Sequence, residues 1–108
     1  MSRDDIAPAQ QSQRLDCGDI VMYSTAWCGD CRRAKRVFAA LEVPYHEIDI
    51  EEDSAARQLV QHMNDGMNRV PTILFPDGGY LAEPHTAALE SRLREYLTDC
   101  AATSANGR

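Results

Sequence analysis

The fold of this chain is decided by one stretch near its N-terminus, Asp19-Ile20-Val21-Met22-Tyr23-Ser24-Thr25-Ala26-Trp27-Cys28-Gly29-Asp30-Cys31. Its first part is short, largely apolar and rich in β-branched side chains, which predicts a buried strand. Two cysteines follow directly. Beyond them apolar residues recur at intervals of three and four, as on one face of a helix that ends before Pro44. The stretch therefore predicts a strand that points at a cysteine pair on the start of a helix.

The hydrophobic pattern further along predicts the rest of one α/β unit. Residues 45–50 alternate as in a half-buried strand, and residues 51–63 have an acidic cap and an apolar helical face. Residues 72–75 and 80–82 predict a β-hairpin around the turn Asp77-Gly78-Gly79, and a last helix begins beyond Pro84. Because residues 28–44 are long enough for one crossover helix, we expect the first two strands to be parallel.

The length and composition indicate one soluble domain. With 108 residues and 12.0 kDa, the chain is long enough for a single modest core. We expect this domain over residues 17–100, between polar, flexible tails at residues 1–16 and 101–108. The formal net charge of -6 disfavours nucleic acid as a partner. Neither a signal peptide nor an apolar run of about 20 residues is present, so we expect a cytoplasmic protein without a membrane anchor.

The cysteine pair has the spacing of a redox site. Unpaired N–H groups at the start of a helix stabilise a thiolate, and Cys28 holds that position. Cys31 lies about one turn further on, on the apolar stripe, close enough to attack a sulfur held on Cys28. We therefore expect Cys28 to be the nucleophile and Cys31 the resolving thiol, with turnover through a mixed disulfide. Trp27 is expected to form one wall of the docking surface.

Two further segments are candidate parts of the site. Val70 and Pro71 would expose backbone groups for strand-like pairing with a substrate if the bond between them is cis. A run of cations follows the cysteine pair on the predicted helix. It is either a solvated helix face or a partner-docking surface in an otherwise acidic protein, and its residues are Arg32, Arg33, Lys35 and Arg36.

The motif Trp-Cys-x-x-Cys after the first strand, Val-Pro-Thr opening the third and a glycine-bearing hairpin before the last helix resemble the glutaredoxins. Among these the chain is most similar to the mycoredoxins of bacteria that use mycothiol, through Trp27-Cys28-Gly29-x-Cys31 and Asn68-Arg69-Val70-Pro71-Thr72. The resemblance covers residues 19–97. It implies an α/β, thioredoxin-like fold of the glutaredoxin type, with a four-stranded mixed sheet flanked by three helices, and a cis Pro71.

The same resemblance implies a function. Protein disulfides mixed with a low-molecular-weight thiol would be reduced by a monomeric enzyme, with small-thiol contacts at Trp27, Arg69, Val70, Pro71, Gly78 and Gly79. The chain has Gly29-Asp30 where glutathione-dependent relatives usually have Pro-Tyr, and Ala26 instead of a lysine precedes Trp27. Mycothiol is therefore the expected co-substrate, with bacillithiol and glutathione as alternatives.

Two other functions use the same cysteines. One is a thioredoxin-like dithiol electron donor that is recharged by a flavoprotein reductase. The other is a module that binds zinc or an iron–sulfur cluster. No metal is expected, because a second cysteine pair is missing and the histidines are scattered at His46, His62 and His85. Cys17 near the tail and Cys100 on the last helix are expected to be bystanders, with a regulatory disulfide as the alternative.

Overall fold

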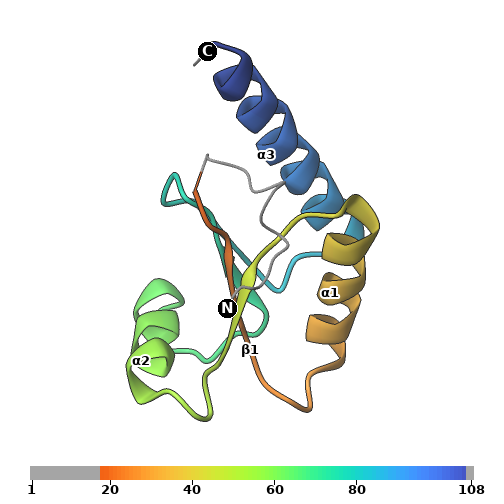
Figure 1. Ribbon diagram of the computed structural model, residues 1–108. Coiled ribbons are helices and arrows are strands. Elements are labelled where there is room, and N and C mark those ends of the chain that lie inside the picture. The colour runs from red at the N-terminus through yellow and green to blue at the C-terminus, as the bar shows by residue number, and fades with distance from the viewer. Residues whose placement is uncertain (1–17, 107–108) are drawn as a thin grey trace, which may run out of the picture.

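The computed structural model describes residues 18–106, with side chains described up to residue 100. The expected tail at residues 1–16 and Cys17 lie outside this range. Figure 1 shows strands and helices in the predicted order. Their bounds are β1 Val21–Ser24, α1 Gly29–Leu41, β2 His46–Asp49, α2 Ser54–Met63, β3 Thr72–Leu74, β4 Tyr80–Ala82 and α3 Thr86–Asn106.

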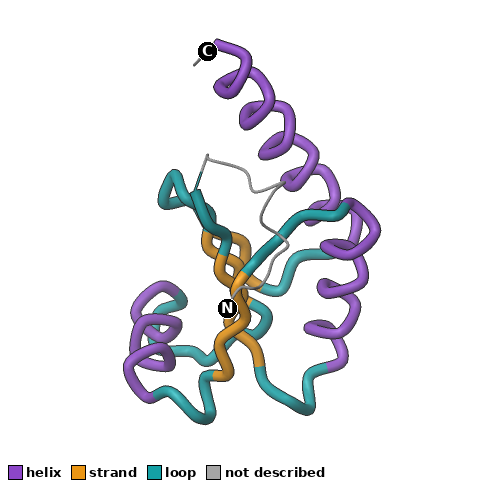
Figure 2. Tube along the Cα trace, viewed as in Figure 1, coloured by secondary structure: helices purple, strands orange, loops and turns teal. Residues whose placement is uncertain are grey.

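The four strands form one mixed sheet in the order β2-β1-β3-β4 (Figure 2). β1 pairs with β2 in parallel, with Val21 opposite His46, which confirms the predicted crossover through α1. β3 is antiparallel to both β1 and β4, with Tyr23 opposite Thr72 and Thr72 opposite Ala82. Three strand ends therefore lie side by side at the same end of the sheet: the C-terminal ends of β1 and β4 and the N-terminal end of β3.

The helices cover both faces of this sheet, with α1 and α3 on one side and α2 on the other (Figure 1). Successive side chains of a strand point to opposite faces, so Met22 and Tyr23 of β1 enter different cores. Met22 packs in the larger cluster with Phe38 of α1 and Leu93 of α3. Tyr23 packs in the smaller cluster, which contains Val60 of α2 and both cysteines of the pair.

The ends of α1 and α2 follow from local side-chain chemistry. Cys28 is the N-cap of α1, and the chain leaves this helix at Glu42 in the left-handed conformation, φ 57°. Asp53 caps α2, because its Oδ1 accepts a hydrogen bond from the N–H of Ala56 at 3.0 Å. The acidic cap predicted for this second helix is therefore present.

The last helix is longer than the domain boundary expected from the sequence. α3 continues to Asn106, so its backbone extends into the segment 101–108, which we expected to be a flexible tail. Three of the eight residues of this segment are alanine, the residue with the highest helix propensity. Within residues 18–106, none of the helices has the length and apolar character needed to cross a membrane.

Asn64 connects α2 to the start of β3. Its side chain is buried, and its Nδ2 donates to the Val60 carbonyl at 2.8 Å and to Thr72 Oγ1 at 3.3 Å. Thr72 Oγ1 in turn donates to the Arg69 carbonyl at 2.7 Å. These contacts hold the segment that precedes β3 against the C-terminal end of α2.

We predict that Asn64→Ala lowers the free energy of unfolding by about 1–3 kcal/mol, because it leaves buried hydrogen-bonding groups without their partner. Urea denaturation followed by circular dichroism measures this change. Asn68→Ala is the matched control, since Asn68 is exposed, and it should change stability by less than about 0.5 kcal/mol. Equal effects of the two substitutions would contradict the role given to Asn64.

Candidate active site

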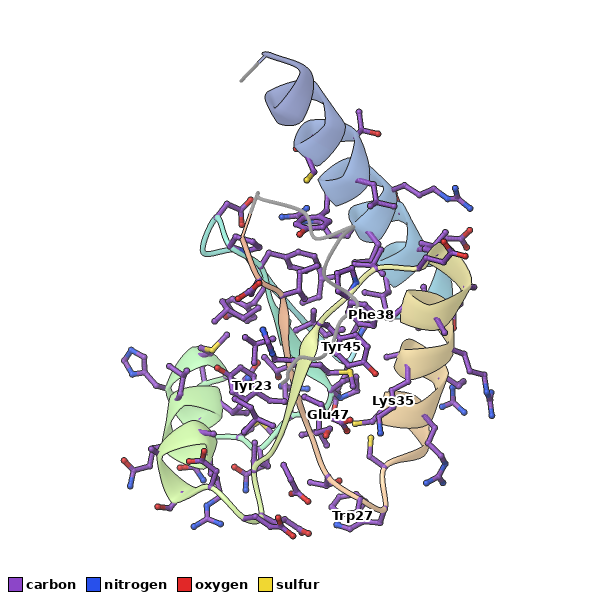
Figure 3. The ribbon with its side chains drawn as sticks, in the orientation of Figure 1. Tyr23, Trp27, Lys35, Phe38, Tyr45 and Glu47 are labelled. Atoms are coloured by element: carbon purple, nitrogen blue, oxygen red, sulfur yellow. The ribbon has the colours of Figure 1, made fainter. Side chains whose placement is uncertain are left out.

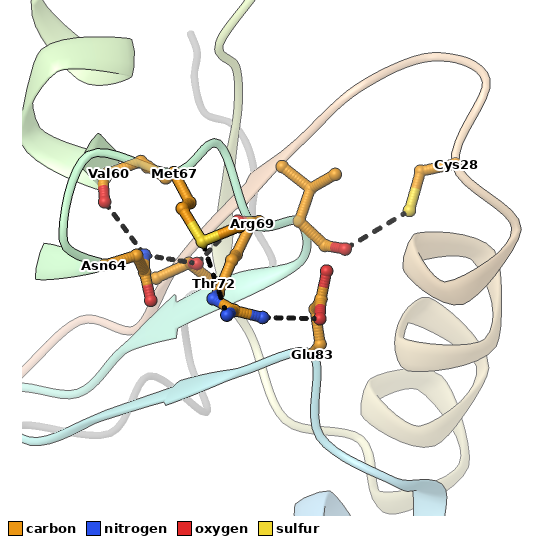
Figure 4. A network of polar contacts seen from close by, with 8 residues as sticks. Cys28, Val60, Asn64, Met67, Arg69, Thr72 and Glu83 are labelled. Atoms are coloured by element: carbon orange, nitrogen blue, oxygen red, sulfur yellow. Dashed lines mark hydrogen bonds and ion pairs between the residues drawn. The ribbon is translucent and has the colours of Figure 1, made fainter.

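The Sγ atom of Cys28 lies where β1 ends and α1 begins. As the N-cap residue, Cys28 has an extended backbone, and its Sγ accepts a hydrogen bond from the N–H of Cys31 at 3.1 Å. The same sulfur donates to the carbonyl of Val70 at 3.7 Å (Figure 4). The side chain is largely covered, with 6% of its residue surface exposed. Cys28 therefore occupies the helix-start position at which a thiolate is stabilised.

Cys31 lies deeper than Cys28, with only 1% of its surface exposed. Burial raises the pKa of the Cys31 thiol to about 12, and its hydrogen bond with Cys28 adds to this increase. A backbone hydrogen bond from Thr25 and the positive charge of Lys35 act in the opposite direction. The two sulfurs therefore have unequal properties, and Cys31 remains a protonated thiol at neutral pH.

The segment before β3 supplies the other side of the site. The Val70–Pro71 bond is cis, as the family resemblance implies, and the Val70 carbonyl points at Cys28 (Figure 4). The carbonyl of Pro71 accepts a hydrogen bond from the N–H of Glu83 at 2.8 Å. Glu83, directly after β4, has a φ of 49° and thus turns the chain sharply at this edge of the sheet.

One hydrogen bond and one ion pair involve residues that flank the site of Cys28. The indole of Trp27 is 66% exposed, and its Nε1 donates to Glu51 Oε2 at 3.0 Å. On the other side, Arg69 forms an ion pair with Glu83 at 3.2 Å (Figure 4). The structure therefore brings Trp27, Arg69 and the Val70–Pro71 segment to the edge of the sheet where Cys28 lies.

The expected placement of Gly78 and Gly79 beside the small thiol is wrong. Both lie in the β3–β4 turn, where the N–H of Gly78 donates to the Phe75 carbonyl and Gly78 has a φ of 93°. This turn follows Leu74, which pairs with Val21 at the start of β1, whereas Cys28 follows the end of β1. The glycines therefore lie at the opposite end of the sheet, and they serve the tight turn.

The cations of α1 do not form one surface. Arg32 and Arg33 are exposed, and Arg33 forms an ion pair with Asp30. Lys35 instead points toward β2, where its Nζ lies 2.8 Å from Glu47 Oε2 (Figure 3). Glu47 is a site residue that the sequence pattern does not predict, because strand alternation places it on a polar face but does not say which helix that face meets.

Cys100 is also not the bystander that we expected. It is buried on α3 and disulfide-bonded, while Cys28 and Cys31 are free thiols. Within residues 18–106, no three His, Cys, Asp or Glu side chains gather in an arrangement that could hold a metal ion.

This arrangement can perform thiol–disulfide exchange. Cys28 can attack a disulfide sulfur and hold one half as a mixed disulfide, and Cys31 is within reach of that bond. The Val70 and Pro71 backbone lies beside it, where an extended substrate can pair. A βαβαββα fold with Cys-x-x-Cys at the start of its first helix and a cis proline opposite defines a thioredoxin-fold thiol–disulfide oxidoreductase.

Comparison with known proteins identifies the family. The glutaredoxin family model matches residues 20–79, and the chain belongs to the glutaredoxin family. It is 38% identical over 74 residues to a Mycobacterium tuberculosis protein named as a glutaredoxin, covering 68% of this chain and 88% of that protein. It is 31% identical over 75 residues to mycoredoxin 1 of Corynebacterium glutamicum, covering 69% and 92%.

Solved structures agree with this fold. A thioredoxin-like protein superposes with a TM-score of 0.60 at 27% identity, covering 68% of this chain and 97% of the other. The buckwheat glutaredoxin–glutathione complex superposes with a TM-score of 0.59 at 26% identity, covering 85% and 88%.

We predict that iodoacetamide labels Cys28 before Cys31 in the folded, reduced protein at pH 7. The pKa of Cys31 is about 12. Its labelling rate should therefore rise about tenfold per pH unit above neutrality, in step with the thiolate fraction. Mass spectrometry of the digested protein measures both rates. In denatured protein the two cysteines should label alike, and equal labelling in the folded protein would refute the difference.

Proposed function

We propose that this protein reduces mixed disulfides between proteins and a low-molecular-weight thiol, with mycothiol as that thiol. Cys28 attacks the small-thiol sulfur of the substrate, which releases the protein as a free thiol and leaves the small thiol on Cys28. A second small-thiol molecule then regenerates Cys28 and departs as a symmetrical disulfide. We place this reaction in the cytoplasm, carried out by a monomer.

The observation that carries this proposal is the different position of the two sulfurs. Cys28 caps α1 beside the Val70 carbonyl and is 6% exposed. Cys31 is 1% exposed, with a pKa of about 12. A nucleophile at a helix start, next to a more deeply buried thiol that is reluctant to ionise, favours a cycle in which Cys28 acts with an external thiol.

The choice of mycothiol depends on the relatives and on the charges at the rim. Mycoredoxin 1 is among the relatives, and the resemblance to the mycoredoxins implies mycothiol as the small thiol. Glutathione is an anionic thiol whose carboxylates need cations, yet Ala26 precedes Trp27, and the Arg69 guanidinium is engaged by Glu83. The buckwheat relative is in complex with glutathione, so glutathione remains a necessary arm of any test.

We predict that Cys28→Ser lowers mixed-disulfide reductase activity by more than about a thousandfold, because the attacking thiolate is lost. Cys31→Ser should retain at least about a third of the activity, since the resolving thiol is not required when an external thiol completes the cycle. Release of a labelled thiol from a protein mixed disulfide measures both variants. Retained activity of Cys28→Ser would overturn the proposed nucleophile.

The identity of the small thiol is tested with one protein carrying mycothiol, bacillithiol or glutathione as a mixed disulfide. We predict that mycothiol is released with the highest kcat/KM. Each thiol is also supplied as the reductant of its own mixed disulfide, so that both halves of the cycle are compared. Faster release of glutathione or bacillithiol would replace mycothiol in the proposal.

A dithiol electron donor is the second candidate, because the side chains of Cys28 and Cys31 are hydrogen-bonded to each other, so the two sulfurs that an internal disulfide would join are neighbours. In that case a flavoprotein reductase would recharge the pair. Complete loss of activity in Cys31→Ser, with disulfide reduction intact in the unaltered protein, would favour this candidate. Stoichiometric zinc or iron in protein purified without added metal, together with no reductase activity, would favour a metal-binding module instead.

A further inference from the structure

An ion pair joins Lys35 of α1 to Glu47 of β2, on the same helix that carries the cysteine pair. Lys35 Nζ is 2.8 Å from Glu47 Oε2, and the same oxygen accepts a hydrogen bond from Ser24 Oγ at 2.7 Å. Ser24 is the last residue of β1 and is 1% exposed. Lys35 is four residues after Cys31 on α1, so the two side chains lie on the same face of the helix. Figure 3 shows Lys35 and Glu47 pointing toward each other.

The groups that act electrostatically on Cys31 are few. They are Cys28, whose charge raises the pKa of Cys31, and Lys35, whose charge lowers it. Lys35 itself faces Glu47 and Tyr45, and its hydrogen bond to Glu47 raises its own pKa. Burial raises the pKa of Glu47, but the hydrogen bonds from Lys35 and Ser24 bring it below its ordinary value. The cation that acts on Cys31 is thus held by an ionised carboxylate at neutral pH.

The reaction in which this matters is closure of the Cys28–Cys31 disulfide. The Cys31 thiol loses its proton, and its sulfur attacks the Cys28 sulfur of the mixed disulfide. The new bond joins Cys28 to Cys31, while the bond from Cys28 to the small thiol breaks. The departing thiolate takes up one proton, so the step is balanced, with Cys31 oxidised and the small thiol reduced. Closure competes with regeneration of Cys28 by a second small thiol.

We infer that Glu47 is a positioning residue that slows closure by Cys31, because it engages the Lys35 ammonium that would otherwise stabilise the Cys31 thiolate. The inference rests on the proposed function, since it assumes a mixed disulfide at Cys28. A carboxylate 2.8 Å from the ammonium cancels much of its field at a third group. The hydrogen bond from Ser24 Oγ holds the Glu47 carboxylate in this position. Glu47 thereby lengthens the time for which the Cys28 mixed disulfide is open to an external thiol.

The experiment follows both steps with an aromatic disulfide, dithiodipyridine, added in excess to the reduced protein. Attack by Cys28 releases one coloured thione, at a rate that depends on reagent concentration. Closure by Cys31 releases a second thione, at a rate that does not. Cys28→Ser gives the background from other thiols, and Cys31→Ser removes the second phase. Absence of the first phase would overturn the proposed function, whereas the second phase tests only Glu47.

We expect Glu47→Gln to accelerate the second phase about threefold at pH 7. A pKa of Cys31 lower by about one unit raises its thiolate fraction about tenfold, and lower intrinsic nucleophilicity cancels about half of that gain on a logarithmic scale. The pH profile of the second phase should shift toward lower pH. Lys35→Met should shift the profile toward higher pH and slow closure by a smaller factor, because Glu47 already cancels much of the field of the Lys35 ammonium in the unaltered protein. Glu95→Gln, the same charge change at an exposed site on α3, is the control and should leave the profile in place.

The double variant Lys35→Met/Glu47→Gln decides whether Glu47 acts through Lys35. Glu47→Gln should have no accelerating effect in that background. Ser24→Ala is a milder variant that loosens the carboxylate, and it should accelerate closure by a smaller factor if Glu47→Gln does not fold. An unchanged second phase in the folded Glu47→Gln or Ser24→Ala protein would overturn the inference. The same acceleration with and without Lys35 would also overturn it.

Discussion

The sulfur of Cys28 is the point at which three separate parts of the chain are held together. It accepts the N–H of Cys31 at 3.1 Å and so completes the first turn of α1, and it donates to the Val70 carbonyl at 3.7 Å. A helix start has N–H groups without partners of their own, and the residue that caps it settles where the helix begins. Here the capping atom is also the nucleophile. The position of the reactive sulfur is therefore a consequence of how α1 begins and of how the chain enters β3.

Support for this junction comes from the second core and from the segment before β3. Val70 and both cysteines pack with Val60 of α2, and Asn64 at the end of that helix reaches Thr72. The helix on one face of the sheet thus steadies the strand that carries the carbonyl opposite Cys28. A catalytic geometry placed on packed elements in this way is better defined than one placed on loops.

Much of the fold and the centre of the site could be predicted because they depend on local patterns. Consecutive residues are enough to predict three features: a short apolar strand, a cysteine pair at a helix start, and a helix that ends before Pro44. Predictions from the sequence fail where the position of a segment depends on which strands pair. An Asp-Gly-Gly turn predicts a hairpin correctly, yet only the antiparallel register shows that this turn lies at the end of the sheet opposite Cys28. The helix of α3 beyond residue 100 was missed because small residues there resemble a tail.

Glu47 shows the same limit within the site. Alternation indicates that its side chain and that of Ile48 point to opposite faces of β2, but only the parallel pairing of β2 with β1 brings it to Ser24 and to Lys35 of α1. Its partners lie at sequence distances that no local pattern encodes. The hydrophobic stripe of α1 did predict that Cys31 is buried, and this burial raises the pKa of its thiol. The positive charge of Lys35 lowers that pKa only a little, because Lys35 is paired with Glu47. Packing therefore gives two chemically identical side chains different roles, because it places the sulfur of Cys28 at a helix start and buries that of Cys31 more deeply.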